Sequence, residues 1–230
     1  MRKADYDQRY VSFDYFPKDF ILEQWSEGKT ITSFNYESGK WYFVFSKLGK
    51  YSRESYSLKY DFPEDWIYEK RQDGYNCTSI TFGDKKWIVV MSKPENSEDR
   101  LTFESVKKGS INDITEFIEY KWGYGYFITH VAFGNGEWVV VMAKNTGYRH
   151  QVYRYQSAFP EEWIDKYYKQ EYRITGLTYS GKTWFVVMSK IPNPPGEICF
   201  YNENTPSDFL QKYWDKGYRV VLLKNSLPLE

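Results

Sequence analysis

The stretch of sequence that decides the fold is residues 159–190, FPEEWIDKYYKQEYRITGLTYSGKTWFVVMSK. It starts with Phe-Pro and two acidic residues, continues through a Tyr-x-Ile-Thr phrase and ends with an apolar segment that runs from Trp to Lys. Residues 62–93, FPEDWIYEKRQDGYNCTSITFGDKKWIVVMSK, show the same order of residue types over the same length. Two such passages in one chain indicate a structural unit that is used more than once.

Weaker copies extend this repeat over most of the 230 residues. The anchor aromatic of each copy recurs at intervals of 46, 51, 46 and 46 residues, at positions Phe20, Trp66, Phe117, Trp163 and Phe209. A second Trp stands six residues before a Lys in four copies, giving the pairs Trp41 and Lys47, Trp87 and Lys93, Trp138 and Lys144, and Trp184 and Lys190. The chain is therefore interpreted as a single repeat domain over residues 1–228, with units at about 16–61, 62–112, 113–158 and 159–204 and end fragments at 1–15 and 205–228. Residues 229–230 are interpreted as a cloning remnant.

The sequence pattern of each unit predicts one short helix and three strands. Pro63 and Pro160, each followed by acidic residues, are expected at the first helical position, and Gly74, Gly125 and Gly217 are expected to end their helices. Residues 138–142 are apolar at every position, which predicts a strand buried on both faces. The four recurring Trp residues are accordingly interpreted as core residues, and stacking against sugar is the alternative. The predicted fold class is mainly β with short helices.

The two end fragments leave the arrangement of the units open. Residues 1–15 match a third strand with no unit before it, and residues 205–223 match a helix and first strand with no Trp strand after them. Closure into a propeller-like or toroidal ring of about five units, with residues 8–14 pairing with 218–223, would protect both edges. The alternative is an open array of which this chain is a part.

Composition excludes several classes of protein. Aromatic residues make up 21% and charged residues 27% of the chain, as in a globular rather than a disordered protein. The formal net charge of zero provides no global field toward nucleic acid or an acidic membrane, so neither sequence-specific nucleic-acid binding nor membrane association is expected. The apolar runs are too short to span a bilayer. Two cysteines without a CxxC partner favour a reduced, cytoplasmic protein.

The sequence contains no motif of a catalytic, cofactor or metal site. Its two histidines, His130 and His150, lie on different predicted strands. Either one with Cys77 or Cys199 could suggest a Cys-His site, but no flanking motif supports it. Walker, dinucleotide-binding and HExxH patterns are missing from the sequence. We therefore expect a protein that is not an enzyme and holds neither cofactor nor metal.

The phrase Trp-Ile-x-x-x-Trp-x-x-Gly-Tyr-x-Ile-Thr, followed by Trp-x-Val-Val-Met-Ser-Lys, resembles a repeat module found after the catalytic domain of plant casein-kinase-1-like protein kinases. A similar module occurs in bacterial multidomain proteins, some with caspase-like peptidase domains. The resemblance covers about residues 8–223 and is most specific in 66–91 and 163–190. It implies an accessory role and carries over no catalytic residue. The chain departs from the pattern at Arg71 and Tyr168, where other copies have a second Trp, and at Asp113 and Ile114, where others have Phe-Pro.

Two functions remain after these exclusions. The first is a protein-interaction or regulatory accessory domain, favoured by the repeats, the neutral charge and the lack of catalytic groups. The second is a ligand-binding module for an anionic or carbohydrate ligand. For an anion, the candidate site is a rim formed by the recurring lysines Lys47, Lys93, Lys144 and Lys190, which a ring would place at equivalent positions around one axis. The alternative role of these lysines is to keep strand ends soluble and unpaired.

Overall fold

A computed structural model describes residues 2–3, 7–47, 50–192, 214–216 and 218–220. In these residues the protein is mainly β, with four short helices and four three-stranded antiparallel sheets. The helices are α1 (Lys18–Ser26), α2 (Glu64–Gln72), α3 (Ile111–Trp122) and α4 (Glu161–Tyr168). The first two sheets have the strand orders β2 (Gln8–Phe13), β4 (Lys40–Ser46), β3 (Thr30–Glu37) and β5 (Tyr51–Lys59), β7 (Lys86–Pro94), β6 (Asn76–Gly83). The other two are β8 (Thr102–Gly109), β10 (Glu137–Lys144), β9 (Phe127–Gly134) and β11 (His150–Gln156), β13 (Trp184–Lys190), β12 (Tyr172–Tyr179).

The sheets are offset from the units of the sequence. The strand that ends one sequence unit does not join the hairpin before it but pairs with the Trp strand of the following unit, as β5 does with β7 and β11 with β13. Each sheet is thus completed by residues that come before its own helix. Residues 8–13 follow the same rule, because β2 pairs with β4 along its whole length, from Gln8 opposite Ser46 to Phe13 opposite Trp41. Consecutive units are therefore tied together covalently and by backbone hydrogen bonds.

The helices begin and end where local chemistry dictates, with one difference from the predictions. Pro63 and Pro160 were predicted at the first helical position but occupy the N-cap, one residue before the helices begin at Glu64 and Glu161. In the unit without Phe-Pro, Ser110 caps the start of the helix. The hydroxyl of Ser110 accepts from the backbone N–H of Asp113, and the carboxylate of Asp113 accepts from the backbone N–H of Ser110, which together form a capping box. Gly74 follows its helix with a φ of +88°, as predicted for a residue that tolerates the left-handed region. Gly217 lies outside the described residues.

The middle strand of every sheet forms the core. The exposed fractions of Trp41, Trp87, Trp138 and Trp184 are 1%, 2%, 6% and 7%, so the prediction that these residues are structural is confirmed. Three apolar clusters join neighbouring sheets: Ile88 and Val90 of β7 pack with the first sheet, Val139 and Val141 of β10 with the second, and Phe185 and Val187 of β13 with the third. The next sheet along the chain, together with a helix, therefore buries apolar residues of each of the first three sheets.

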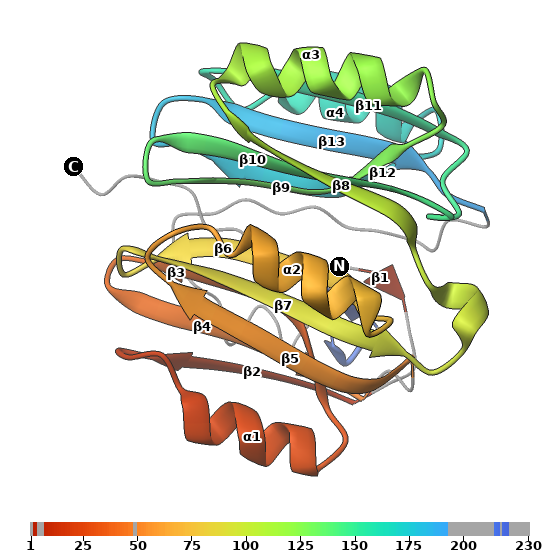
Figure 1. The fold of residues 1–230 in the computed structure, drawn as a ribbon. Coiled ribbons are helices and arrows are strands. Elements are labelled where there is room, and N and C mark those ends of the chain that lie inside the picture. The colour runs from red at the N-terminus through yellow and green to blue at the C-terminus, as the bar shows by residue number, and fades with distance from the viewer. Residues whose placement is uncertain (1, 4–6, 48–49, 193–213, 217, 221–230) are drawn as a thin grey trace.

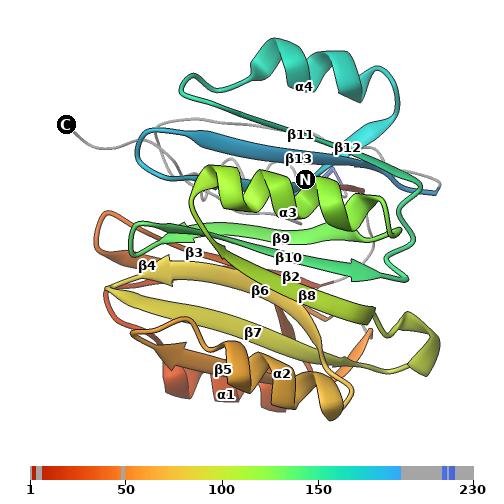
Figure 2. The ribbon, with the colours of Figure 1, turned by 45° about the horizontal axis from the view of Figure 1, so that its top comes forward.

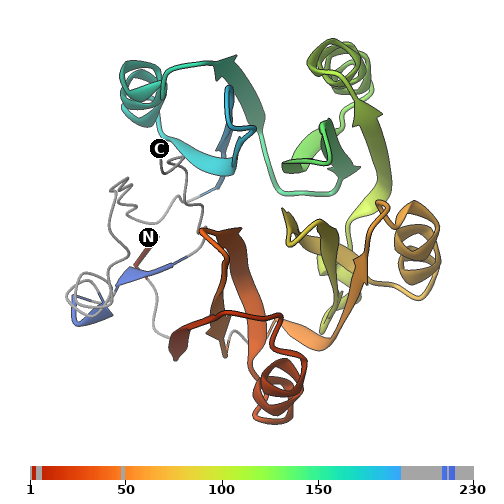
Figure 3. The same cartoon turned by 90° about the vertical axis from the view of Figure 1, so that its left-hand side faces the viewer.

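The four sheets are arranged around a common axis, with the helices farthest from it (Figure 3). Figures 1 and 2 show the same helices on the outer side of the sheets. Toward the axis, β3 lies beside β6, β6 beside β9, and β9 beside β12. Adjacent units approach so closely that a Cβ on Gly134 would lie 2.2 Å from the Cβ of Phe82, and only glycine fits such a contact.

The two ends of the described chain meet. Strand β1 (Arg2–Lys3) pairs antiparallel with β14 (Tyr218–Arg219), and buried Val220 packs with Val44 of the first sheet. The prediction that residues 8–14 pair as a strand with 218–223 is wrong for the described part: residues 8–13 pair with β4, and the strand that pairs with residues 218–219 is residues 2–3. Residues 221–223 lie outside the described residues.

Candidate binding site at the centre of the molecule

Every inner strand carries a β-bulge at its threonine. The residues on both sides of each threonine are paired with the neighbouring middle strand, and the register skips the threonine itself. The four bulged residues are Thr32, Thr78, Thr129 and Thr175. A bulge turns its extra residue out of the ordinary alternation of side chains. The recurring Ile-Thr phrase of the sequence therefore encodes an irregularity that is repeated around the axis.

The bulged threonines explain the serine that precedes the recurring lysine. The hydroxyls of Thr32 and Ser46 lie 2.6 Å apart, those of Thr78 and Ser92 2.7 Å apart, and those of Thr175 and Ser189 2.6 Å apart. In the third unit, which has Ala143 instead of Ser, Thr129 donates to the backbone carbonyl of Val141 at 3.1 Å. The three serines are fully buried, so their hydroxyls are not exposed beside the lysines.

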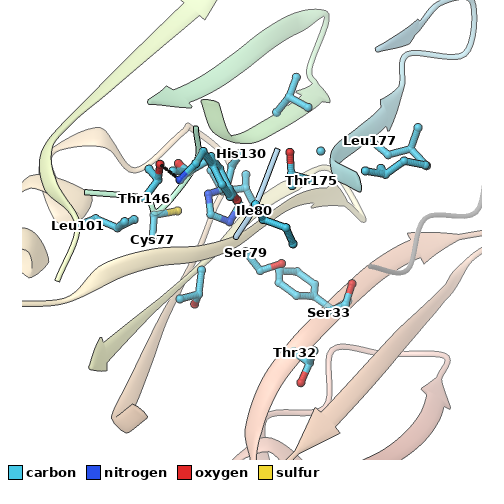
Figure 4. Close-up of a pocket in the computed structure, with 18 of the residues that line it drawn as sticks. Thr32, Ser33, Cys77, Ser79, Ile80, Leu101, His130, Thr146, Thr175 and Leu177 are labelled. Carbon is cyan, nitrogen blue, oxygen red and sulfur yellow. Dashed lines mark hydrogen bonds between the residues drawn. The ribbon is translucent and has the colours of Figure 1, made fainter. Parts of the chain in front are cut away.

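A cavity of about 310 Å³ opens where the inner strands meet (Figure 4). Residues from β3, β6, β9 and β12 line it, including Thr32, Ser33, Cys77, Thr78, Ser79, Thr129, His130 and Thr175. Part of its wall comes from the segments that follow the middle strands, at Tyr51, Leu101 and Tyr148. Among the described residues that line it there is neither a carboxylate nor an ammonium or guanidinium group. Its hydroxyls and aromatic rings suit an uncharged polar group.

The cavity contains a thiol and an imidazole that the sequence left far apart. Cys77 of β6 and His130 of β9 both line it, whereas His150 lies elsewhere, with its Nδ1 2.8 Å from the hydroxyl of Tyr172. Burial raises the pKa of the Cys77 thiol well above its ordinary value, which disfavours the thiolate that a nucleophile needs. Cys199 lies outside the described residues. Within the described part of the chain, no group of His, Cys, Asp and Glu is suited to hold a metal ion.

The predicted lysines lie at the ends of the middle strands and outside the cavity. Lys93, Lys144 and Lys190 each place the ammonium group over a tyrosine ring of their own unit, 5.8, 5.0 and 5.3 Å from the centroids of Tyr75, Tyr126 and Tyr172. Lys47 lies beside Gly28, which is followed by Lys29 where the other units have that tyrosine. The four lysines thus occupy equivalent places, one in each unit, and none of them lines the axial cavity.

The structure reveals a set of residues at the joints between units that sequence reasoning did not single out. We call Gln8, Glu54, Glu104 and Gln151 the junction residues. Gln151 is the clearest example: its Oε1 accepts from the backbone N–H of Ile128 at 2.7 Å and from the indole N–H of Trp122 at 3.4 Å. Its Nε2 donates to the carbonyl of Ile128 at 2.9 Å and to the hydroxyl of Ser189 at 2.8 Å. One buried amide therefore ties the third unit to the fourth sheet.

Gln8 repeats this arrangement between the two ends of the chain. Its Oε1 accepts from the N–H of Val220 at 2.7 Å and from the indole of Trp214 at 3.0 Å. Its Nε2 donates to the carbonyl of Val220 at 2.8 Å and to Ser46 at 2.9 Å. The sequence signal for these contacts was the recurrence of Gln or Glu two residues before a tyrosine, at Tyr10, Tyr56 and Tyr153.

The two middle joints use acids. Glu54 accepts from Ile31 N at 2.8 Å, from the indole of Trp25 at 2.7 Å and from the hydroxyl of Ser92 at 2.8 Å, and burial raises its pKa to about 7. Glu104 accepts from Cys77 N at 3.1 Å and pairs with the guanidinium of Arg71 at 3.0 Å. Recurrent polar residues thus act as joints between units.

Comparison with known proteins gives one family. The sequence pattern of a family described as a domain of unknown function, DUF7477, matches residues 4–104 and again residues 103–226. No curated protein matches the chain. Among the described residues there is also no helix with the length and apolar character of a membrane span.

Proposed function

The chain belongs to the DUF7477 family of domains of unknown function, and we propose that it is a non-catalytic accessory module that binds a partner protein through its axial cavity. Four inner strands contribute to one hydroxyl-lined, uncharged cavity, and this is the observation that supports the proposal most directly. Tyrosine and leucine at its wall, in Tyr51, Leu101 and Tyr148, are residue types that suit an uncharged segment of polypeptide.

Ring closure is part of the proposal, because a cavity on the axis needs walls on all sides. The contacts of Gln8 with Val220 and Trp214, and the pairing of β1 with β14, support a propeller-like arrangement of about five units rather than an open array. The resemblance to modules that follow kinase or peptidase domains supports an accessory role beside an enzyme. A cytoplasmic location, in which Cys77 stays reduced, fits the same proposal.

A cavity-filling variant tests the binding site. Ser79 lines the cavity, so Ser79→Trp should fill part of it, whereas Ser157 is exposed and Ser157→Trp provides a matched control. Immobilised protein would be exposed to an extract of the source cells, and the captured partner would then be produced pure for titration. We expect the partner to bind the wild type and Ser157→Trp equally and to bind Ser79→Trp at least about tenfold more weakly. Equal binding to all three would contradict the axial site, and the failure of any purified partner to bind would contradict the proposal.

A carbohydrate ligand is the second candidate. The observation in its favour is the same lining, because hydroxyl groups and the rings of Tyr51 and Tyr148 are the chemistry that holds a sugar. A glycan array with wild type and Ser79→Trp separates the two candidates: a sugar bound by the wild type alone favours carbohydrate, and no bound sugar favours the protein partner.

A further inference from the structure

The joint between the second and third units departs from the repeat in three places. Arg71 stands where the first and third helices have Trp25 and Trp122, and Ala143 stands where the other units have serine before the lysine. The third departure is the five-residue insertion after Lys93, which lengthens the interval between anchor aromatics from 46 to 51 residues. The structure brings them together at one joint.

Arg71 and the inserted segment meet at Glu104. The Nε of Arg71 lies 3.0 Å from a carboxylate oxygen of Glu104, in a side chain that is 2% exposed. A guanidinium N–H of Arg100, which comes from the inserted segment, donates to the backbone carbonyl of Arg71 at 2.6 Å. Ala143 lies in β10 between the partners of Ser105 and Thr102, so it faces the same part of β8. The tryptophan of the usual joint is thus replaced by Arg71 and the serine by Ala143, and the inserted segment adds Arg100.

The inserted segment is fixed from both sides. On one side, Asn76 of β6 donates to the carbonyl of Asp99 at 3.1 Å and accepts from the N–H of Leu101 at 3.0 Å. On the other, the amide of Asn145 donates to the carbonyls of Glu98 at 3.0 Å and Arg100 at 2.9 Å. These bonds hold the backbone on both sides of Arg100. Its side chain therefore starts from a preorganised position, which lowers the entropy cost of binding a ligand.

A second cavity, of about 260 Å³, lies at this joint and is lined by Arg71, Tyr75, Arg100, Leu101, Thr102 and Glu104. Its charges do not cancel, because two guanidinium groups face one carboxylate. Burial raises the pKa of Glu104 to about 7, against the attraction of Arg71 and Arg100, so part of its negative charge is lost near neutral pH. The ammonium groups of Lys70 and Lys93 lie over the ring of Tyr75, 5.1 and 5.8 Å from its centroid. Asp73, 3.9 Å from Lys70, opposes them.

We propose that this pocket, formed by Arg71, Arg100 and Glu104 at the joint of the second and third units, binds a small oxyanion: a carboxylate or phosphate group of a metabolite or of a modified protein. Guanidinium groups bind such groups through paired N–H donors, and the contacts described above use only some of the donors of the two arginines. This site adjoins the axial cavity, with which it shares Leu101, and gives an anion a defined place that the lysine rim does not.

The test uses inorganic phosphate and malonate as probes, titrated into the folded protein by calorimetry at low ionic strength and again with added salt. We expect saturable binding of at least one probe, weakened by salt because the contact is electrostatic. Arg100→Ala, in an exposed side chain, should weaken binding about tenfold or more with little change in melting temperature. The variant Arg71→Trp, Glu104→Gln, Ala143→Ser restores the usual joint and should fold but no longer bind.

Lys190→Ala is the matched control, because it removes a lysine of the predicted rim in a different unit. Binding that survives Lys190→Ala and is lost in Arg100→Ala supports the pocket. Binding that is lost equally in both variants would assign the anion to the lysine rim and overturn the proposal. Absence of saturable binding of both probes to the wild type, or wild-type affinity in Arg100→Ala, would also overturn it. A carboxylate source and a phosphate source are distinguished by which probe binds more tightly.

Discussion

Gln151→Ala is the sharpest test of how the units are joined. The substitution removes an amide that satisfies both the N–H and the carbonyl of Ile128, a residue only 1% exposed. Each buried polar group left without a partner costs about 1–3 kcal/mol, so these two groups together predict a loss of about 4 kcal/mol in the free energy of unfolding. The other two contacts add less: Ser189 keeps its hydrogen bond with Thr175, and the half-buried indole of Trp122 can reach water.

Urea denaturation, followed by tryptophan fluorescence and circular dichroism, measures this loss. Gln151→Glu should lie between the wild type and Gln151→Ala, because a carboxylate keeps the acceptor and loses the donor to the carbonyl of Ile128. Gln170 is an exposed residue just after the fourth helix, and Gln170→Ala should change stability by less than about 0.5 kcal/mol. A loss of less than about 1 kcal/mol in Gln151→Ala would refute the role of the junction residues, since water would then be replacing the amide.

Three further predictions follow from burial and pairing. Trp138→Ala and Trp184→Ala should each lower the free energy of unfolding by about 3–5 kcal/mol, measured by urea denaturation, and near-neutral effects would contradict their place in the core. Glu54→Gln should become more stable relative to the wild type as pH rises. The pKa of Glu54 is about 7 in the folded protein and 4.5 ordinarily, so the wild type gains stability from protonated Glu54 at low pH. Between these two pKa values the free energy of unfolding of the wild type should fall by about 1.4 kcal/mol per pH unit. A stability difference between the two proteins that stays constant from pH 4 to 8 would show that Glu54 does not titrate in this range. Deletion of residues 1–15 removes β2 and the contacts of Gln8, and should cost several kcal/mol in thermal melts, whereas an unchanged melting temperature would favour the open array.

The sequence determined the number, length and content of the units. The periods of aromatic residues, the Phe-Pro helix starts and the apolar strand of residues 138–142 are local patterns, and local backbone preferences and burial make them readable without a structure. The burial of Trp41, Trp87, Trp138 and Trp184 followed from the same reasoning and is confirmed.

The tertiary structure decided how the units are joined. Sequence grouped the third strand with the hairpin before it in one unit and left its pairing open, whereas hydrogen bonds tie β5 to β7 and β11 to β13. The free edge of each Trp strand is completed by the segment that the chain brings alongside. The same limit applies to the sites. Cys77 and His130, and likewise Arg71 and Arg100, are distant in sequence and share a cavity only once the sheets have packed. A repeat specifies its own strands and helix through local interactions, whereas its joints depend on contacts between residues of different units, which no pattern within a single unit contains.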